Sequence, residues 1–373
     1  MQALHAFERD IIKGVLMRIC YFGTFNKDYL RNRIIREGFR RNGVEVVLCH
    51  TKYTWFLMVY LKLTFRWVFK TRKNIDAIIV GETGYILMPL AKLIGLIWGI
   101  PVILDAFFSV YQTEVYDRKR VSKNSLKAQK IHFIEEMGCK LADLVLLDTN
   151  EHIGYFVDEH GIDRKKFLRV LVGADDSIFK PLELKAASDK FRVLYWGTFI
   201  PLHGVEYIIG AAKILESENE IVFKFIGNGQ TRDDAVRLSE ELGLKNTEFV
   251  DYTDEASLVK SISEASVCMG IFGNTLKTKE VIPHKLYQAM ACKKPVITGD
   301  TPATRELLKD METVMFCETG NPGRLAEKIM FLKNNRETAG KIAAEAYRYF
   351  KGNLVPEQIV KGLINRMETG KNG

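Results

Sequence analysis

Residues suited to phosphate chemistry gather in the segment Phe272–Thr298. Its pattern predicts a strand, a polar loop and a helix over His284–Ala291, with Pro283 before or at the first helical turn. The N-terminus of a helix offers free amide N–H groups and a partial positive charge, which suit a phosphate. Lys277 and Lys285 can add full positive charges. The segment therefore predicts a phosphate-binding site.

Two other polar residues of this segment suit sugars. Gln288 lies one turn into the predicted helix, where its amide can hydrogen-bond a ribose hydroxyl. Glu280, in the loop, can accept hydrogen bonds from sugar hydroxyls. The alternative interpretation is an ordinary amphipathic connection between two strands.

A second pattern, Tyr195–Tyr207, predicts a strand that enters a glycine-bearing loop and then a helix. Such a loop lets the backbone approach a phosphate or a sugar closely. His203, beside Gly204, could donate a hydrogen bond to a diphosphate or to the attacking group. A purely structural histidine is the alternative.

Several common catalytic motifs are absent from the sequence. It contains no phosphate-binding loop of the G-x-x-x-x-G-K-[ST] type, no Gly-x-Ser-x-Gly and no Asp-x-Asp. Gly227 and Gly229 follow a predicted strand but are followed by Arg232, so they match a dinucleotide fingerprint poorly. These absences disfavour P-loop nucleotidases, serine hydrolases and dinucleotide oxidoreductases.

Length and composition indicate a two-domain globular protein. The 373 residues suffice for two cores, and 47% hydrophobic with 27% charged residues is typical of folded proteins. The net charge of +8 favours polyanions, anionic membrane surfaces or phosphorylated small molecules. The six cysteines form no C-x-x-C pair, which indicates reduced, buried thiols in a cytosolic protein and no zinc framework. Glu8 and Asp10 make the N-terminus unlike a signal peptide.

Short β-rich runs alternate with helix-length segments, which predicts an α/β fold with parallel sheets. The predicted strands of the first series are Met17–Phe22, Val44–Leu48, Asp76–Val80, Pro101–Asp105, Asp143–Leu147 and Phe167–Leu171. Those of the second series are Phe191–Trp196, Ile221–Ile226, Glu248–Val250, Ser266–Ile271, Pro295–Thr298 and Val314–Phe316. Ligands of such sheets bind beyond the carboxyl ends of the strands, so two facing domains would form a cleft.

The domain boundary is predicted in the turn-rich stretch after Gly173. The sequence predicts these parts: an N-terminal extension (1–16), a first Rossmann-like domain (17–174), a hinge (175–190), a second Rossmann-like domain (191–350) and a C-terminal helical segment (351–373).

These residues resemble the retaining, metal-independent glycosyltransferases of family four, which have the GT-B fold of two facing Rossmann-like domains. The sequence YWGTFIPLHG resembles the first phosphate-binding loop of that family, and FIGNGQ resembles its nucleobase loop. Glu280 to Gln288 resembles the signature of two glutamates separated by seven residues, and GADDSIFKP resembles the linker. FGTFNKDYLRNR and DAFFSVYQTEVYDRKR resemble a subgroup that acts on membrane glycolipids and polysaccharide precursors. The family also implies that the last helix crosses back onto the first domain.

The resemblance implies a set of site residues. The catalytic residues would be Glu280, His203 and Asp105. The donor nucleotide-sugar would contact Gly197, Thr198, Gly204, Gly227, Asn228, Gly229, Lys277, Pro283, His284, Lys285, Leu286 and Gln288. The acceptor side would include Gly23, Thr24, Arg31, Asn32, Arg33, Glu82 and Thr83. No metal and no cofactor besides the sugar donor are expected.

The sequence departs from the family at three positions. Gln288 stands in place of the second signature glutamate, and Thr198 and His203 replace the usual basic residues of the first loop. Lys285, Lys277 or the pair Arg31 and Arg33 would then hold the diphosphate. Asp105 lies where the family often has a histidine.

The segment Thr51–Lys73 has six basic residues, no acidic residue and seven aromatic residues. On a helix, an apolar stripe of Phe56, Tyr60, Leu63 and Trp67 lies beside a basic stripe of Lys62, Arg66 and Lys70. This composition favours docking to an anionic membrane surface. A core helix or an oligomer interface is the alternative, and no nucleic-acid recognition motif accompanies the segment.

The sequence therefore predicts a glycosyltransferase that moves a sugar from a nucleoside-diphosphate sugar to a lipid-linked or saccharide acceptor at the cytosolic membrane face, with retention of configuration. A sugar-nucleotide epimerase or hydrolase of the same fold is one alternative. The other is a catalytically silent partner subunit, which the altered first loop and Gln288 make conceivable.

Overall fold

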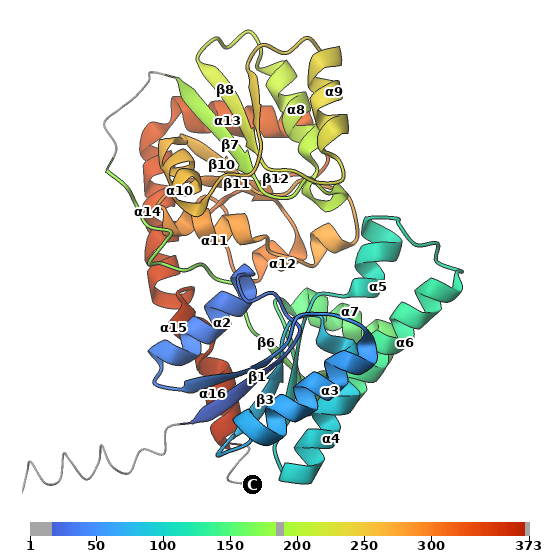
Figure 1. The fold of residues 1–373 in the computed structure, drawn as a ribbon. Helices are drawn as coiled ribbons and strands as arrows, with labels where there is room; N and C mark the ends of the chain where they lie inside the picture. Colours follow the sequence, from blue (N-terminus) through green and yellow to red (C-terminus); the bar gives the residue numbers. More distant parts are fainter. Residues whose placement is uncertain (1–16, 184–189, 370–373) are drawn as a thin grey trace, which may run out of the picture.

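The computed structural model describes residues 17–183 and 190–369. The chain forms two α/β lobes, one above the other in Figure 1. The predicted extension 1–16 lies outside the described residues, as do residues 184–189 of the predicted hinge and residues 370–373. The free cysteines are all buried.

The first lobe is built on a six-stranded sheet in the order β2-β1-β3-β4-β5-β6, and every neighbouring pair is parallel. Its strands are β1 (Arg18–Gly23), β2 (Glu45–His50), β3 (Ala77–Val80), β4 (Val102–Phe107), β5 (Leu144–Leu147) and β6 (Phe167–Arg169). All six predicted runs are strands. β4 continues two residues beyond the prediction, through a register shift between Asp105 and Phe107.

Helices cover both faces of this sheet (Figure 1). They are α2 (Leu30–Arg41), α3 (Phe56–Arg66), η1 (Trp67–Thr71), η2 (Gly84–Leu87), α4 (Met88–Trp98), α5 (Val110–Gln112), η3 (Thr113–Asp117), α6 (Leu126–Leu141), α7 (Asn150–His160) and η4 (Arg164–Lys166). The strands carry alternating apolar residues into two separate clusters, one on each face, because β-strand side chains point alternately to the two sides.

The second lobe repeats this plan with a parallel sheet in the order β12-β11-β10-β7-β8-β9. Its strands are β7 (Phe191–Trp196), β8 (Ile221–Ile226), β9 (Thr247–Val250), β10 (Val267–Met269), β11 (Val296–Gly299) and β12 (Met315–Cys317). Its helices are η5 (Pro201–His203), α8 (Val205–Ile214), α9 (Arg232–Glu241), α10 (Glu255–Glu264), η6 (Lys277–Lys279), α11 (His284–Ala291), α12 (Pro302–Arg305), α13 (Pro322–Asn334) and α14 (Arg336–Asn353). The two sheets confirm the predicted doubly wound α/β architecture.

The last two helices return to the first lobe. α15 (Pro356–Ile359) lies beside α2, and α16 (Lys361–Thr369) follows it along the first lobe (Figure 1). Val360 and Leu363 are fully buried in the same apolar cluster as Ile35, and the Asn42 side chain donates a 2.9 Å hydrogen bond to the carbonyl oxygen of Glu357. The chain thus crosses between the lobes twice, once after β6 and once after α14.

The segment Thr51–Lys73 forms a helix, but its exposed apolar side is not the predicted stripe. Leu63 and Trp67 are fully buried against the first sheet. The exposed apolar residues of this segment are Tyr53, Trp55, Phe56, Leu57, Met58, Leu61, Phe65 and Phe69. The prediction placed Leu63 and Trp67 on the wrong side, because helical spacing gives the width of an apolar stripe and does not distinguish the core side from the solvent side.

Candidate functional site

The carboxyl ends of the two sheets face each other, and a cavity of about 420 Å³ lies between the lobes. It is lined from the first lobe by Tyr29, Leu30, Phe107, Phe108, Thr113, Asp117, Arg118 and Asp148. It is lined from the second lobe by Trp196, Gly197, Thr198, Ile200, Leu202, His203, Tyr252, Leu258, Lys277, Val281, Ile282, Pro283, His284, Lys285 and Gln288. Such a position, outside the carboxyl ends of parallel strands, is where α/β proteins bind ligands.

Lys285 and His203 meet beneath the loop that follows β7. The Lys285 ammonium nitrogen lies 3.9 Å from the centre of the Tyr195 ring and 3.5 Å from Nδ1 of His203. The Tyr195 hydroxyl lies 2.8 Å from the same Nδ1. Burial lowers the pKa of Lys285 well below its ordinary value. Burial also lowers the pKa of His203, and the neighbouring Lys285 lowers it further.

In the part of the chain that the structure describes, no carboxylate forms an ion pair with Lys285, and burial is the sole cause of its pKa shift. A buried ammonium is costly unless an anion pairs with it. The first turn of α11 lines the same cavity and contributes its partial positive charge. The arrangement is therefore suited to a polyanionic group such as a diphosphate.

Two glycine loops pack closely beside this place. A Cβ atom on Gly227, whose φ is 132°, would lie 2.1 Å from the carbonyl oxygen of Gly197. The Gly197 amide donates to the carbonyl oxygen of Ile226 at 2.9 Å, and the Phe199 amide donates to that of Asn228 at 2.9 Å. Only glycine fits at position 227, and this contact fixes the loop over Lys285.

The other predicted donor residues are distributed around these loops. Thr198 Oγ1 lies 3.1 Å from the Tyr252 hydroxyl, and the Trp196 indole donates a 2.7 Å hydrogen bond to Oε1 of Gln288. Gly204 precedes α8 in a left-handed conformation, while Asn228 and Gly229 are exposed. The Leu286 side chain is 1% exposed and packs in the core, so it does not face the cavity.

Lys277 also lines the cavity and contacts the first lobe. Its ammonium contacts Thr113 Oγ1 and lies 4.7 Å from the centre of the Phe108 ring. Burial lowers its pKa to about 8, and the nearby Asp117 opposes that change. Both carboxylate oxygens of Asp117 are buried without a hydrogen-bond partner among the described residues. A sugar hydroxyl could satisfy these oxygens.

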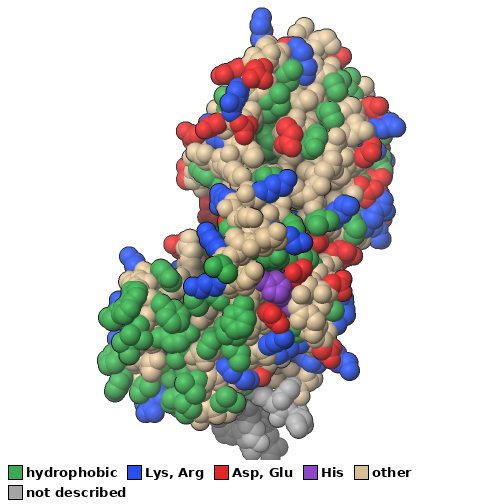
Figure 2. Space-filling view, turned by 90° about the vertical axis from the view of Figure 1, so that its right-hand side faces the viewer, with side chains coloured by type: hydrophobic (Ala, Val, Ile, Leu, Met, Phe, Trp, Pro, Cys, Tyr) green, Lys and Arg blue, Asp and Glu red, His purple; other side chains and the backbone are tan. Residues whose placement is uncertain are grey.

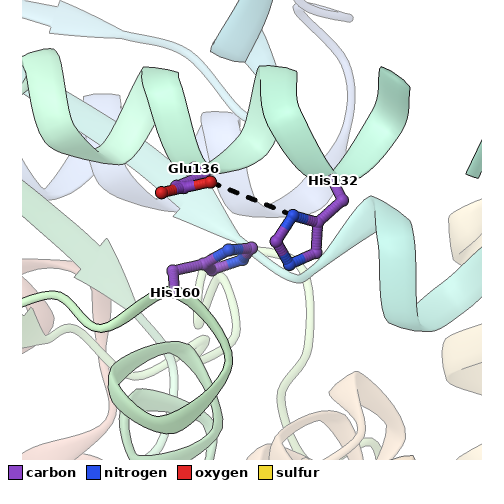
Figure 3. Close-up of side chains that lie close together, drawn as sticks. All are labelled: His132, Glu136 and His160. Carbon is purple, nitrogen blue, oxygen red and sulfur yellow. Dashed lines mark ion pairs between the residues drawn. The ribbon is translucent and has the colours of Figure 1, made fainter. Parts of the chain in front are cut away.

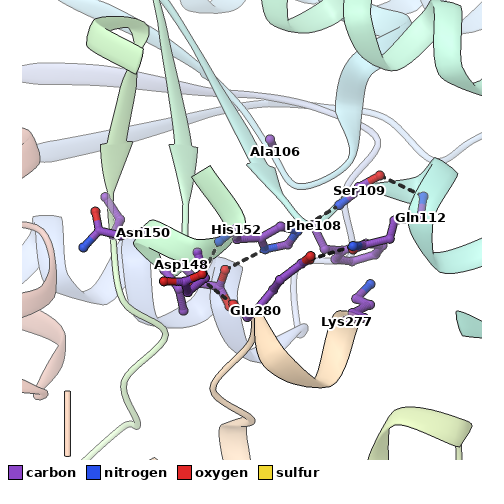
Figure 4. Close-up of polar contacts among 12 residues, drawn as sticks. Ala106, Phe108, Ser109, Gln112, Asp148, Asn150, His152, Lys277 and Glu280 are labelled. Carbon is purple, nitrogen blue, oxygen red and sulfur yellow. Dashed lines mark hydrogen bonds and ion pairs between the residues drawn. The ribbon is translucent and has the colours of Figure 1, made fainter. Parts of the chain in front are cut away.

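Glu280 joins the two lobes through a polar network shown in Figure 4. Its carboxylate accepts a 2.6 Å hydrogen bond from the Gln112 side chain, and its carbonyl oxygen accepts one from Thr149 Oγ1. Burial raises its pKa, whereas Gln112 and His152 lower it. Glu280 does not line the cavity itself, whereas Lys277 and Val281, which are close to it in the sequence, do.

His152 belongs to the same network and is fully buried. Its Nδ1 lies 2.9 Å from Oδ1 of Asp148, which lines the cavity, and its Nε2 faces the Ser109 amide at 3.4 Å. His152, Asp148 and Asp117 are not among the site residues predicted from the sequence. The spacing of Asp148 and His152, four residues apart just after a strand, was the available signal for two of them.

Asp105, predicted as a catalytic residue, and several residues predicted on the acceptor side lie away from the cavity. Asp105 is fully buried in an ion pair with Arg31, whose guanidinium bonds it at 2.7 and 2.9 Å and also donates to the Val170 carbonyl oxygen at 3.0 Å. Burial raises the pKa of Asp105, and the attraction of Arg31 opposes that rise. Neither residue lines the cavity.

Asn32 accepts a hydrogen bond from the Tyr21 hydroxyl at 2.8 Å, so it too is occupied inside the first lobe. Arg33 pairs with Glu255 of α10 at 2.8 Å and thereby connects the lobes at their surface. Burial raises the pKa of Glu82 to about 8, and its Oε2 has no hydrogen-bond partner among the described residues. Gly23 and Thr24 lie at the end of β1, and Thr83 follows β3; none of the three lines the cavity. The half-buried His284 ring lies tilted against the rings of Tyr29 and Phe107, with centroids 5.9 and 5.8 Å away, and burial lowers its pKa to about 4.

Comparisons with known proteins agree with this architecture. Residues 177–349 match the family described as Glycosyl transferases group 1. An uncharacterized glycosyltransferase of Methanocaldococcus jannaschii is 28% identical over 173 residues, which are 46% of this chain and 46% of that protein. The phosphatidyl-myo-inositol mannosyltransferase of Mycobacterium leprae is 26% identical over 177 residues, or 45% of each chain. The matched region thus spans about half the length of these curated relatives.

Two solved structures cover nearly the whole chain. HepE of Anabaena, in complex with UDP-glucose, has a TM-score of 0.73 at 14% identity and covers 95% of this chain and 100% of its own. Sucrose-phosphate synthase of Thermosynechococcus elongatus has a TM-score of 0.70 at 16% identity, with the same coverage. The chain therefore has the GT-B fold of glycosyltransferases, and its second lobe matches the group 1 glycosyltransferase family.

Proposed function

We propose that this protein is a glycosyltransferase that takes a sugar from a nucleoside-diphosphate sugar and transfers it to a saccharide or lipid-linked acceptor. The observation that carries the proposal is the unpaired, buried Lys285 beneath the Gly197 loop, at the inter-lobe cavity. The family match over residues 177–349 and the UDP-glucose complex of HepE support the same proposed function.

In this proposal the donor diphosphate lies between the first turn of α11 and the Gly197 loop. Lys285 and Lys277 neutralise its charge, and His203 donates a hydrogen bond to it. Gln288 contacts the ribose with the amide nitrogen that Trp196 leaves free. The transferred sugar then lies toward the first lobe, where Asp117 accepts hydrogen bonds from its hydroxyls.

The proposed reaction retains the anomeric configuration and requires no metal. The bond between the anomeric carbon and the diphosphate oxygen breaks, and the acceptor oxygen forms the new bond on the same face. The acceptor proton passes to the leaving phosphate oxygen. The two lysines and the α11 N-terminus stabilise the negative charge that develops on that oxygen. Added Mg²⁺ or Mn²⁺ is therefore expected to leave the transfer rate unchanged.

In this proposal Glu280 and His152 position other residues and do not contact the substrate. Glu280 holds Gln112 and so fixes η3, from which Asp117 and Thr113 face the cavity. Asp148 holds the His152 ring, and His152 faces the amide of Ser109, the residue that caps α5. Asp105 and Arg31 are assigned to the folding of the first lobe, because their polar atoms already bond each other and the backbone.

We also propose that transfer takes place at the cytosolic face of the cell membrane, where the first lobe binds anionic lipid. Figure 2 shows a broad apolar surface on this lobe. The exposed apolar residues of α3 continue onto α4, where Leu93, Leu96 and Ile97 are 55%, 70% and 62% exposed. Lys62, Arg66 and Lys70 are exposed on the same segment, and no acid occurs between residues 51 and 73. Among the described helices, none is long and apolar enough to cross a bilayer.

Sedimentation with anionic vesicles tests the membrane proposal. The full chain is expected to bind at low salt, and salt is expected to weaken binding because the cations contribute. Leu61→Ser with Phe65→Ser is expected to abolish binding. Phe133→Ser is the matched control, because Phe133 is 62% exposed on α6, outside the basic segment. Absence of binding at low salt overturns the membrane proposal and leaves the donor site untouched.

A thermal-shift panel of UDP, GDP, ADP, CDP and dTDP tests the donor site. A ligand at about 100 times its dissociation constant stabilises a protein by about 2.7 kcal/mol. One nucleotide is expected to raise the melting temperature of the chain, and the same nucleotide joined to a sugar then serves as donor in a transfer assay. A flat response to all five contradicts the donor site and favours a silent subunit. Release of free sugar without an acceptor product favours a hydrolase.

A further inference from the structure

Two histidines and one glutamate converge between α6 and the end of α7 in the first lobe (Figure 3). His132 and Glu136 lie one turn apart on α6, and His160 is the last residue of α7. One potential ligand atom from each of the three side chains lies within 4.8 Å of the others. None of the three residues lines the inter-lobe cavity.

One ring nitrogen of His160 contacts a carboxylate, and the other has no partner among the described residues. Its side chain is fully buried, and its Nε2 lies 3.1 Å from Oε1 of the buried Glu135. Because an ionised carboxylate only accepts hydrogen bonds, this contact assigns the ring proton to Nε2. The lone pair of Nδ1 is then free, and Nδ1 has no hydrogen-bond partner among the described residues. A buried acceptor without a partner is costly, and a metal ion would satisfy it.

His132 has a matching arrangement. Its Nε2 lies 3.0 Å from Oε1 of Glu159, which assigns the proton to that nitrogen. Its Nδ1 faces Oε2 of Glu136 at 4.0 Å, too far for a hydrogen bond and wide enough for an ion to enter between them. Each histidine thus has a carboxylate that orients the ring from behind, which is the usual support of a metal-binding histidine.

The donor set selects the kind of metal. Two imidazole nitrogens and one carboxylate suit Zn²⁺ and similar transition metals, whereas Mg²⁺ and Ca²⁺ prefer oxygen ligands. A tetrahedral centre with bonds of about 2.1 Å separates its ligand atoms by roughly 3.4 Å. The side chains of His132 and Glu136 are each 28% exposed and can close that difference by small rotations. Glu136 would then exchange its ion pair with Lys140, which is 57% exposed, for the metal.

We propose that His132, Glu136 and His160 bind one Zn²⁺ ion, with solvent in the fourth position, and that this ion ties α6 to the end of α7. Glu135 connects this site to the start of α5. That carboxylate also accepts hydrogen bonds from Ser109 Oγ at 2.6 Å and from the Val110 amide at 2.6 Å. A metal on His160 therefore fixes the start of α5. The ion is structural, since it touches no residue of the donor cavity, and the proposed transfer chemistry does not depend on it.

Zinc titration of the full chain, purified without a polyhistidine tag and stripped with a chelator, tests this site. One equivalent of Zn²⁺ is expected to bind by calorimetry and to raise the melting temperature. Co²⁺ in place of Zn²⁺ is expected to give the visible absorption of a tetrahedral centre. The double variant His132→Asn with Glu136→Gln is expected to bind at least a hundredfold more weakly. Both side chains are partly exposed, so this variant is expected to keep the circular dichroism of the parent.

The control is His50→Asn, because His50 is a half-buried histidine of the same lobe with one ring nitrogen bonded to the carbonyl oxygen of Phe25. This variant is expected to bind zinc like the parent. Absence of a bound equivalent in the parent overturns the proposal. Full binding by the folded double variant also overturns it, because the zinc is then held elsewhere. Neither result affects the thermal-shift panel of nucleotides, which tests the donor site independently.

Discussion

Arg31 in the first lobe and Lys285 in the second are both buried cations near the carboxyl edge of a parallel sheet, but their surroundings differ. Arg31 is 0% exposed and bonds the carboxylate of Asp105 and the carbonyl oxygen of Val170. Lys285 is 4% exposed and has the Tyr195 ring and His203 beside it, with no carboxylate partner among the described residues.

This difference separates a structural charge from a binding charge. The attraction of Asp105 compensates the desolvation of Arg31, so the pKa of Arg31 is raised although burial lowers it. Nothing compensates the desolvation of Lys285, and its pKa is lowered. An unpaired buried cation destabilises the fold. At a cavity, this cost in free energy is offset only when an anion binds there. Residue type and burial alone therefore do not identify a site, whereas the missing partner does.

Asp105→Asn is expected to give the largest effect. It leaves the Arg31 guanidinium buried without a counter-charge, and breaking one partner of a buried pair costs about 3–5 kcal/mol. Urea unfolding followed by circular dichroism measures the loss. The double variant Arg31→Met with Asp105→Leu is expected to recover most of it, because it removes both charges. A stable Asp105→Asn protein that has lost transfer would instead return Asp105 to the catalytic role that the resemblance implies.

Lys285→Met is expected to show the opposite pattern. The free energy of unfolding stays equal or rises, since an uncompensated buried charge is removed. Affinity for the nucleoside diphosphate falls about tenfold to hundredfold, because a charged hydrogen bond contributes about 1.5–3 kcal/mol. Calorimetric titration with the nucleotide from the panel measures it. Lys294→Met is the control, a half-buried lysine beyond the far end of α11 whose pKa burial also lowers. Equal loss in both variants would contradict a diphosphate site at Lys285.

The affinity for the nucleoside diphosphate is expected to fall as the pH rises through about 8. Lys277 has a pKa of about 8 because of its burial, so it is charged below that pH and neutral above it. The anion binds the charged form, so binding takes up a proton and affinity drops by up to tenfold per pH unit above the pKa. Lys277→Met removes this part of the pH dependence. The exposed neighbour Lys279 serves as control, and a Lys279→Met profile unlike that of the parent would count against the assignment.

The sequence was a good guide to the fold because strands and loops are local patterns. All twelve strand predictions overlap observed strands, since each buried parallel strand is a short apolar run between turn signals. The loops after β7 and before α11 also lie at the cavity, because the carboxyl ends of parallel strands share one edge.

The partners of the site residues could not be predicted from the sequence. Asp105 and Arg31 are 74 residues apart and meet only in the folded lobe. Gln112 and Glu280 are 168 residues apart and meet only when the two lobes are placed together. For the same reason Asp117 gave no signal on its own, and His152 gave only its four-residue spacing from Asp148. The helical pattern of Thr51–Lys73 likewise left open which side faces the core, and Leu63 and Trp67 are on that side.

Arg33 gives the smallest expected effect, because it is a surface cation that already has a carboxylate partner. Its ion pair with Glu255 joins α2 to α10 at 2.8 Å, with side chains 24% and 46% exposed. Such pairs contribute about 0.2–1 kcal/mol, so Arg33→Ala is expected to change the free energy of unfolding by less than Asp105→Asn.

Because the pair lies between the lobes, its loss is expected to raise the KM for the donor by less than about fivefold and to leave kcat unchanged, which corresponds to a cost of up to about 1 kcal/mol. Glu255→Gln removes the same pair from the other lobe and is expected to reproduce both values. If Arg33→Ala alone raises the KM for the acceptor, while Glu255→Gln leaves it unchanged, then Arg33 contacts the acceptor as the family resemblance implies. Partnered surface cations would then also take part in binding, and the distinction drawn from Arg31 and Lys285 would hold only for buried charges.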